Sequence, residues 1–384
     1  MKESFARISR KKGVTFMLRK ALVLVVGSTL FALPALAAAG WTGGDDLPTN
    51  PLPCDNSSVA MAAKPYDGGV PTNPPDRKGK KITVVDVPKL IGIGYFNATS
   101  KGIADAAKEL GNVSVKTDGP TKANIDEQIT FIDNYITQGV DGILFAANDP
   151  VAIAPVLKKA LSKGIDVVGY DANSTPDARQ WFVNQAQFNG IAKSLMDNMA
   201  KEIGESGAFA IVTSTFTTPN QARWIAEMSA YAAKCHPKMK WLETVEAQED
   251  NVLSFNAATT LINKYGSDLK GLFGMTSVAT PAGAEAITQA KKCGQVAEVG
   301  LATPNAMKPY VNKGCVKSVV LWNPVDLGYA AMYVLRSVAD GTLKPGATSV
   351  KAGKLGELKV VNGSEILLGP PFVYTKANIN NFDF

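Results

Sequence analysis

Hydrophobic and polar positions alternate in two ways along this chain from about residue 81 onward. Short apolar runs, such as residues 142–146, predict strands that are buried on both faces. Longer segments carry apolar residues every three or four positions, as the isoleucines of 124–138 do, and predict amphipathic helices. The expected strands are 82–87, 113–117, 140–146, 165–171, 208–214, 241–247, 270–275, 296–301 and 316–322. The expected helices are 97–110, 124–138, 151–163, 188–203, 220–234, 251–265, 280–292, 305–313 and 326–340.

This regular alternation of strand and helix predicts an α/β fold with doubly wound parallel sheets. It extends over about 300 residues, more than one such domain usually contains, so two domains are expected. Series of strand–helix units that begin at residue 82 and again at residue 208 agree with that division.

The first strand leads into a loop with an unusual composition. Gly92-Ile93-Gly94 resembles the start of a dinucleotide fingerprint, but Tyr95 and Phe96 follow and the third glycine is missing. Two bulky rings would keep the backbone away from a pyrophosphate, whereas they could stack on a sugar ring. The loop therefore favours a sugar over a nucleotide.

The N-terminus reads as a targeting segment. A basic stretch precedes an apolar run at 21–33 and an Ala-x-Ala tail, so residues 1–37 are predicted to be a signal peptide, with Met17 as an alternative start. The apolar run is short for a retained membrane anchor, which is the competing interpretation. We expect export to the periplasm. Residues 38–80 are rich in Gly, Pro, Asn and Asp and predict an irregular extension, poorly ordered unless Cys54 ties it down.

Removal of the signal peptide changes the charge. The whole chain carries a formal charge of +6, but residues 1–37 contain seven basic residues and one acidic residue. The rest holds 33 of each sign, and no basic stripe interleaved with aromatic residues remains. Nucleic-acid binding is therefore not expected.

The chain has four cysteines and one histidine. In an oxidising compartment four cysteines allow three disulfide connectivities, of which Cys293–Cys315 is favoured because it would join a helix end to a strand one unit later. Unpaired buried thiols are the alternative. Because His236 is alone and lies in a Lys-Cys-His-Pro turn, we expect it at the surface, and we expect no zinc site, metal, cofactor or hydrolytic triad.

Polar and aromatic residues gather just beyond the carboxyl ends of the predicted strands, where doubly wound sheets bind ligands. Charged and amide groups there could bind sugar hydroxyls, and the rings could cover the sugar C–H faces. The candidate ligand-binding residues are Lys89, Tyr95, Phe96, Asn148, Asp171, Asn220, Gln221, Ser277, Trp322 and Asn323.

Each candidate also has a structural interpretation. Asp171 could cap a turn, and Tyr95 or Phe96 could anchor the first helix in the core. Trp322 could pack between domains, Asn323 could form a turn before Pro324, and Gln221 could be solvated at a helix start. The set of residues is more informative than any member.

Several segments together carry a resemblance to a known family. They are Val87 to Gly92, Asp118 to Thr121, Ala147 to Pro150, Gly169 to Asp171, Thr303 to Val311, Leu321 to Tyr329 and Asn378 to Phe384. From Lys81 to Phe384 the chain resembles type I periplasmic solute-binding proteins of the ribose-binding group. It is most similar to the branch that holds rhamnose-binding proteins and autoinducer-2 receptors.

The resemblance implies two α/β domains joined by a three-strand hinge that closes over a ligand. The N-lobe would comprise 82–185 plus 323–365, and the C-lobe 186–322 plus 366–384. Lys89 and Asp171 match the family's ligand-holding lysine and aspartate, and Phe96, with Tyr95, its aromatic positions. Asn220 stands where the autoinducer receptors have an aspartate before their glutamine, which argues against an autoinducer ligand. The segments Trp322 to Pro324 and Thr276 to Val278 are more similar to the rhamnose-type members, so the implied ligand is a rhamnose-like sugar or related polyol.

The resemblance further implies a protein that captures a sugar without chemistry and delivers it to the permease of an ABC transporter in the inner membrane. A monomer is expected. The alternatives are a furanosyl autoinducer receptor and a ligand-sensing partner of a chemoreceptor or sensor kinase. A repressor of related fold would need a helix-turn-helix before residue 81, and no residue pattern predicts an enzyme.

Overall fold

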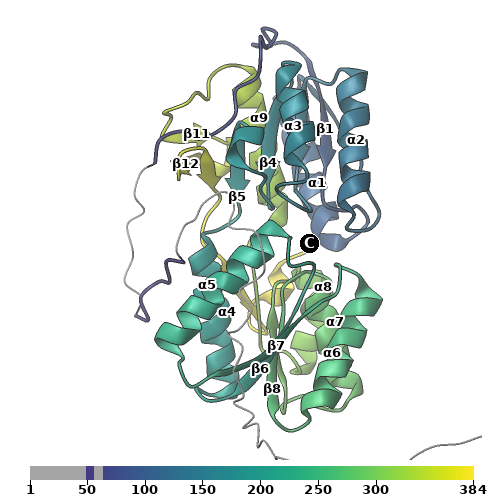
Figure 1. The fold of residues 1–384 in the computed structure, drawn as a ribbon, viewed down its shortest axis with the longest axis vertical. Helices are drawn as coiled ribbons and strands as arrows, with labels where there is room; N and C mark the ends of the chain where they lie inside the picture. Colours follow the sequence, from purple (N-terminus) through teal and green to yellow (C-terminus); the bar gives the residue numbers. More distant parts are fainter. Residues whose placement is uncertain (1–48, 56–63) are drawn as a thin grey trace, which may run out of the picture. The chain divides into compact units, whose positions relative to one another are not determined.

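The structure is a computed structural model that describes residues 49–55 and 64–384. The predicted signal peptide, the possible start at Met17 and the remainder of the 38–80 extension lie outside the described residues. Within the described part, the chain forms two sheet-and-helix assemblies, which we name the N-lobe and the C-lobe (Figure 1).

The N-lobe is built on an eight-stranded sheet in the order β11-β12-β13-β5-β4-β3-β1-β2. Its strands are β1 (Ile82–Val87), β2 (Val113–Thr117), β3 (Gly142–Phe145), β4 (Asp166–Tyr170), β5 (Trp181–Asn184), β11 (Ser349–Lys351), β12 (Glu357–Val361) and β13 (Glu365–Leu367). The first five strands and β13 pair in parallel, whereas β12 pairs antiparallel with β11 and with β13.

Helices cover both faces of this sheet. They are α1 (Gly94–Leu110), α2 (Ile125–Gln138), α3 (Ala154–Ser162) and α9 (Pro324–Ala339). α1 and α9 share one buried cluster, while α2 and α3 belong to another on the opposite face. α1 and α9 approach so closely that a Cβ at Gly102 would overlap the Val325 carbonyl oxygen, and one at Gly328 would overlap that of Thr99. This contact fixes the middle of α1 relative to the start of α9.

The C-lobe has a four-stranded parallel sheet in the order β7-β6-β8-β9. Its strands are β6 (Ala208–Thr213), β7 (Lys240–Glu246), β8 (Leu269–Gly274) and β9 (Ala297–Gly300). Its helices are α4 (Phe188–Ile203), α5 (Pro219–Cys235), α6 (Asn251–Tyr265), α7 (Ala279–Gln289) and α8 (Pro304–Lys313). α4 and α5 cover one face, and α6 and α7 cover the other (Figure 1).

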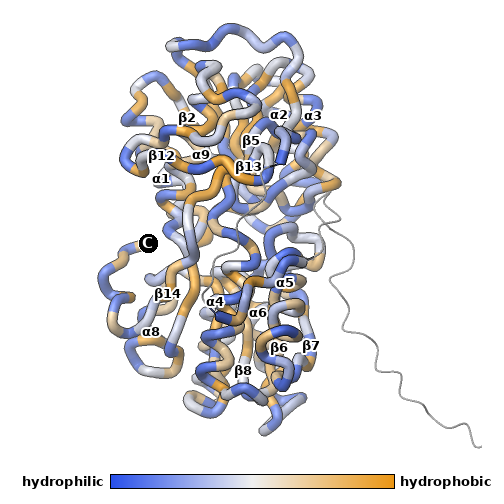
Figure 2. The backbone as a smooth tube through the Cα atoms, turned by 90° about the vertical axis from the view of Figure 1, so that its left-hand side faces the viewer, coloured by the Kyte–Doolittle hydropathy of each residue, from blue (hydrophilic) through white to orange (hydrophobic). Residues whose placement is uncertain are grey.

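The chain passes between the lobes three times, as expected for this fold. The passages follow β5, β10 (Ser318–Leu321) and β13, and the last one enters β14 (Phe372–Thr375). β10 and β14 pair antiparallel in a sheet of their own. Figure 2 shows β13 in the upper lobe and β14 in the lower one, at the two ends of the last passage. Short 3₁₀ turns at Pro176–Ala178, Gly353–Leu355 and Ile379–Asn381 complete the described elements.

The structure corrects two details of the sequence prediction. β5 and the strands from β11 to β14 were not expected, and the pairing of β12 with β11 and β13 makes one edge of the N-lobe sheet antiparallel. The first helix begins at Gly94, three residues earlier than predicted, so Tyr95 and Phe96 lie in its first turn rather than in the loop. That position holds both rings on a rigid element.

The extension contacts both lobes. Cys54 forms a disulfide with Cys235 at the end of α5, and Lys193 of α4 donates to the Cys54 carbonyl oxygen at 3.2 Å. In the N-lobe, the Tyr66 hydroxyl donates to the Gln180 carbonyl oxygen at 2.9 Å, and Arg77 pairs with Asp166. The described parts of the extension are therefore anchored despite their irregular backbone.

The second disulfide joins Cys293 to Cys315, the pairing that the sequence favoured, and no free cysteine is left. The expectation for His236 was wrong. Its side chain is buried at the end of α5, where its ring nitrogens lie 2.7 Å from Glu205 Oε2 and 2.9 Å from Asp197 Oδ1. His236 thus holds α5 to its neighbours.

None of the helices in the described ranges is long and apolar enough to cross a membrane. The same ranges contain no group of three or more His, Cys, Asp or Glu side chains that could hold a metal ion.

Candidate functional site

A small cavity of about 20 Å³ lies where strands of the two lobes end. Its walls come from the loop after β1, the start of α1, the end of β4, the first turn of α5, the loops after β7 and β8, and the passage after β10. The lining residues are Lys89, Tyr95, Asp171, Asn220, Gln221, Trp224, Glu249, Met275, Thr276, Ser277, Leu301, Leu321 and Trp322. All of them except Ser277 are buried.

Three charged side chains meet in this cavity. Lys89 Nζ lies 3.7 Å from Asp171 Oδ2 and 3.2 Å from Glu249 Oε2, and each of the three side chains is at most 4% exposed. Burial lowers the pKa of Lys89, but the two carboxylates outweigh that effect and raise it above its usual value. Lys89 therefore stays charged. It belongs to the N-lobe and Glu249 to the C-lobe, so this ion pair joins the lobes.

Asp171 is held by a short hydrogen-bonded chain. Trp322 Nε1 donates to the Tyr95 hydroxyl at 2.9 Å, which in turn donates to Asp171 Oδ1 at 2.9 Å. Burial and the neighbouring carboxylate raise the pKa of Tyr95 well above its usual value, so the hydroxyl keeps its proton. Oδ1 of Asp171 is thereby occupied, whereas Oδ2 accepts no hydrogen bond from the described residues.

The backbone at Asp171 is also unusual. Its φ is +59°, a left-handed conformation that costs a non-glycine residue about 1–2 kcal/mol. Burial also raises the pKa of its carboxyl, although Lys89 and Tyr95 act against that shift. Such strain at a buried polar residue is typical of functional sites.

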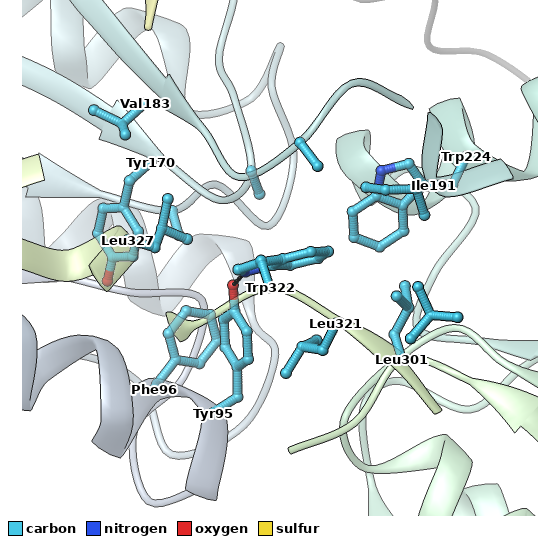
Figure 3. Close-up of a cluster of buried hydrophobic side chains, with 14 of the residues drawn as sticks. Tyr95, Phe96, Tyr170, Val183, Ile191, Trp224, Leu301, Leu321, Trp322 and Leu327 are labelled. Atoms are coloured by element: carbon cyan, nitrogen blue, oxygen red, sulfur yellow. Dashed lines mark hydrogen bonds between the residues drawn. The ribbon is translucent and has the colours of Figure 1, made fainter. Parts of the chain in front are cut away.

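Three aromatic rings also line the cavity. Trp322 lies between Tyr95 and Trp224 (Figure 3), with ring centroids 6.2 Å from Tyr95 and 5.7 Å from Trp224. The Trp322 ring stands edge-on to the Tyr95 ring and is tilted against the Trp224 ring. Rings beside buried carboxylates combine an apolar surface with hydrogen-bond acceptors, the combination that a sugar requires.

The C-lobe contributes amide and hydroxyl groups. Gln221 Oε1 accepts hydrogen bonds from the Thr213 hydroxyl at 2.6 Å and from the Ser214 N–H at 2.8 Å. Asn220 Oδ1 accepts from the Gln221 N–H at 2.9 Å. These bonds fix both amides at the start of α5, where they face the cavity together with Ser277.

Three of the candidates from the sequence do not line the cavity. Phe96 is buried behind it, with its ring centroid 5.6 Å from Lys89 Nζ. Asn148 donates to the Lys89 carbonyl oxygen at 2.8 Å and so supports the lysine loop. Asn323 caps α9 by accepting from the N–H groups of Val325 and Asp326. Phe96 and Asn148 thus support elements that carry lining residues, and Asn323 begins the helix that follows Trp322.

The candidate list missed three polar or aromatic lining residues: Thr276, which adjoins the candidate Ser277, and Trp224 and Glu249. Glu249 follows the strand predicted at 241–247, so a search of every strand's carboxyl end would have found it. Trp224 lies one helical turn after Asn220 and Gln221, on the same face of α5. Helical periodicity could have indicated it.

The sequence of this chain is similar to that of a known protein family. A family model described as "Periplasmic binding protein domain" matches residues 84–343. This chain belongs to the periplasmic binding protein family. The fold, with parallel sheets flanked by helices, is that of its type I members, as the sequence had predicted.

Individual relatives bind various ligands. A D-ribose/D-allose-binding protein of Pseudomonas aeruginosa is 27% identical over 51% of this chain, and the match spans 62% of that relative's length. A solute-binding protein of Clostridium phytofermentas, solved with bound L-rhamnose, is 29% identical with a TM-score of 0.76 and covers 79% of this chain and 98% of its own. LsrB from Clostridium saccharobutylicum in complex with AI-2 shares the fold at 23% identity and a TM-score of 0.75, with 79% and 100% covered.

Proposed function

We propose that this protein is the periplasmic substrate-binding component of an ABC importer and that it captures a monosaccharide between its lobes. The observation that carries the proposal is the buried cavity in which Lys89, Asp171 and Glu249 meet beside the rings of Tyr95 and Trp322. Charged side chains in such a position are costly unless a ligand or partner satisfies them. A polyol satisfies them with hydroxyl groups.

The proposed ligand is a rhamnose-like deoxy-sugar or a related polyol. The relative solved with L-rhamnose supports this choice, and so does Asn220, which is neutral where the resemblance to autoinducer receptors leads one to expect an aspartate. Trp322 and Trp224 offer apolar ring surface against which the methyl group of a 6-deoxy-sugar could pack.

The proposed mechanism is capture without chemistry. Lining residues come from both lobes, so a ligand that contacts both would stabilise the closed form relative to the open one. The closed protein would then dock on the permease in the inner membrane. The three passages between the lobes are the segments about which such a closure would turn.

A thermal-shift and calorimetric panel tests the proposal. The panel contains L-rhamnose, D-ribose, D-allose, erythritol and autoinducer-2, measured on the wild-type protein and on Asp171→Asn. We expect a monosaccharide to bind the wild type and Asp171→Asn to bind it about 10-fold or more weakly, since a hydrogen bond to a charged group is lost. A response to autoinducer-2 alone would favour the receptor alternative, and no response to any sugar would refute sugar capture.

A further inference from the structure

Glu249 is the charged residue of the cavity that neither the sequence pattern nor the family resemblance pointed to. It lies in the turn between β7 and α6, where Gln248 and Glu249 both have a positive φ, +52° and +54°. This turn directs the Glu249 carboxylate into the cavity, where its side chain is 4% exposed. Oε2 accepts no hydrogen bond from the described residues.

Two buried carboxylate oxygens in the cavity therefore have the ammonium of Lys89 as an ion-pair partner but accept no well-formed hydrogen bond. They are Asp171 Oδ2 from the N-lobe and Glu249 Oε2 from the C-lobe, and both lie within 3.7 Å of Lys89 Nζ. A buried acceptor without a donor is unfavourable, so each oxygen is a site for a ligand hydroxyl. The ammonium of Lys89 can donate to a ligand oxygen between them.

The balance of charge restricts the ligand. Among the described residues that line the cavity, Lys89 is the sole cation and faces two carboxylates. An anionic group added to this buried site would meet an excess of negative charge that water cannot screen. Neutral hydroxyl groups, in contrast, are donors to both carboxylates.

We infer that Glu249 is a ligand-binding residue that, together with Asp171, makes the cavity select neutral sugars and reject their acidic counterparts. This inference rests on the proposed function and adds to it the residue that sets the ligand's charge. At the position of Asn220 the autoinducer receptors have an aspartate, which this chain lacks. Here the second carboxylate of the cavity comes from Glu249 in the β7–α6 turn. A purely structural role, in which Glu249 only pairs with Lys89 to hold the lobes together, would weaken all ligands equally.

The test uses pairs of neutral and acidic probes that keep the same pyranose ring: L-rhamnose with L-mannuronate, and D-galactose with D-galacturonate. Affinities are measured by calorimetry on the wild type, Glu249→Gln, Glu249→Asp and the control Glu243→Gln. Glu243 also pairs with a lysine, Lys264, at 2.6 Å, but it lies outside the cavity. Thermal unfolding confirms that each variant is folded.

We expect the wild type to bind a neutral probe at least about 100-fold more tightly than its acidic partner, because the anion would be buried beside the one carboxylate charge that Lys89 does not balance. Glu249→Gln should weaken the neutral probe about 10- to 100-fold, the effect of losing a charged hydrogen-bond acceptor, and should narrow the neutral-to-acid ratio about 10-fold. Glu249→Asp should keep the ratio of neutral to acidic affinity. Glu243→Gln should change neither that ratio nor the affinity for the neutral probe.

Two results would overturn the inference: a wild type that binds an acidic probe as tightly as its neutral partner, or a folded Glu249→Gln with wild-type affinity and selectivity. The wild-type ratio needs no variant, so the first result can be obtained even if Glu249→Gln does not fold. A wild type that binds no neutral sugar at all is a distinct outcome. It would refute the proposed function, and the inference with it.

Discussion

Removing the hydroxyl of Tyr95 tests the hydrogen-bonded chain that organises the cavity. Tyr95→Phe keeps the ring in the first turn of α1 but deletes one atom. That atom accepts from Trp322 Nε1 and donates to Asp171 Oδ1, both at 2.9 Å, and all three side chains are buried. The substitution therefore leaves one donor and one acceptor without their partners.

The size of the effect follows from these two bonds. An unsatisfied buried polar group costs about 1–3 kcal/mol of folding free energy. Part of this cost is offset because the variant no longer has to bury the tyrosine hydroxyl. We expect the free energy of unfolding to fall by about 2–4 kcal/mol. Affinity for the bound sugar should fall about 10-fold, because Asp171 loses the hydrogen bond that orients it.

Denaturant unfolding and calorimetry measure the two quantities. Tyr333→Phe is the matched control, since its hydroxyl also donates to a carboxylate, Glu109, at 2.8 Å, but on an exposed surface. The control should change stability by less than about 0.5 kcal/mol. If Tyr95→Phe resembled Tyr333→Phe in both measurements, the chain from Trp322 to Asp171 would not organise the site.

Three further predictions concern the fold. Gly102→Ala should lower the unfolding free energy by about 1–3 kcal/mol in denaturant titrations because its Cβ would press α1 away from α9, whereas Gly190→Ala, whose Cβ would make only ordinary van der Waals contacts, should not destabilise the protein. Burial lowers the pKa of His236, but Glu205 and Asp197 outweigh it and raise that pKa above its usual value. His236→Gln should therefore destabilise the protein most below about pH 6.5 and progressively less as pH rises through the raised pKa. A difference in melting temperature between wild type and His236→Gln that is equal at about pH 5.5 and about pH 9 would contradict this. All four cysteines should resist alkylation until the protein is reduced, and intact mass spectrometry that found alkylated thiols before reduction would contradict the two disulfides.

The sequence predicted the α/β architecture well because amphipathic helices and buried parallel strands leave long, regular patterns. α4 and α6 begin and end where the periodicity placed them. The strands from β11 to β14 contain three to five residues each and alternate weakly, so local pattern did not reveal them. Their pairing depends on β5 and β10, which lie far away in the sequence.

The site was predictable to the extent that it depends on strand ends. Lys89, Asp171 and Trp322 follow strands directly, and the structure places them together in the cavity. Asn148 and Asn323 also follow strands, but their amides form internal hydrogen bonds, a difference that residue type alone does not reveal. Whether a polar side chain faces the cavity or supports a neighbouring loop is decided by contacts between elements.

The central claim, that the cavity captures a sugar and releases it unchanged, is tested most directly by native mass spectrometry. Purified protein is mixed with the neutral sugars of the panel, and the bound species is then released and identified. The account predicts one noncovalent equivalent of one monosaccharide per chain, recovered with its original mass. Failure of every sugar to bind, or recovery of a chemically altered sugar, would contradict it.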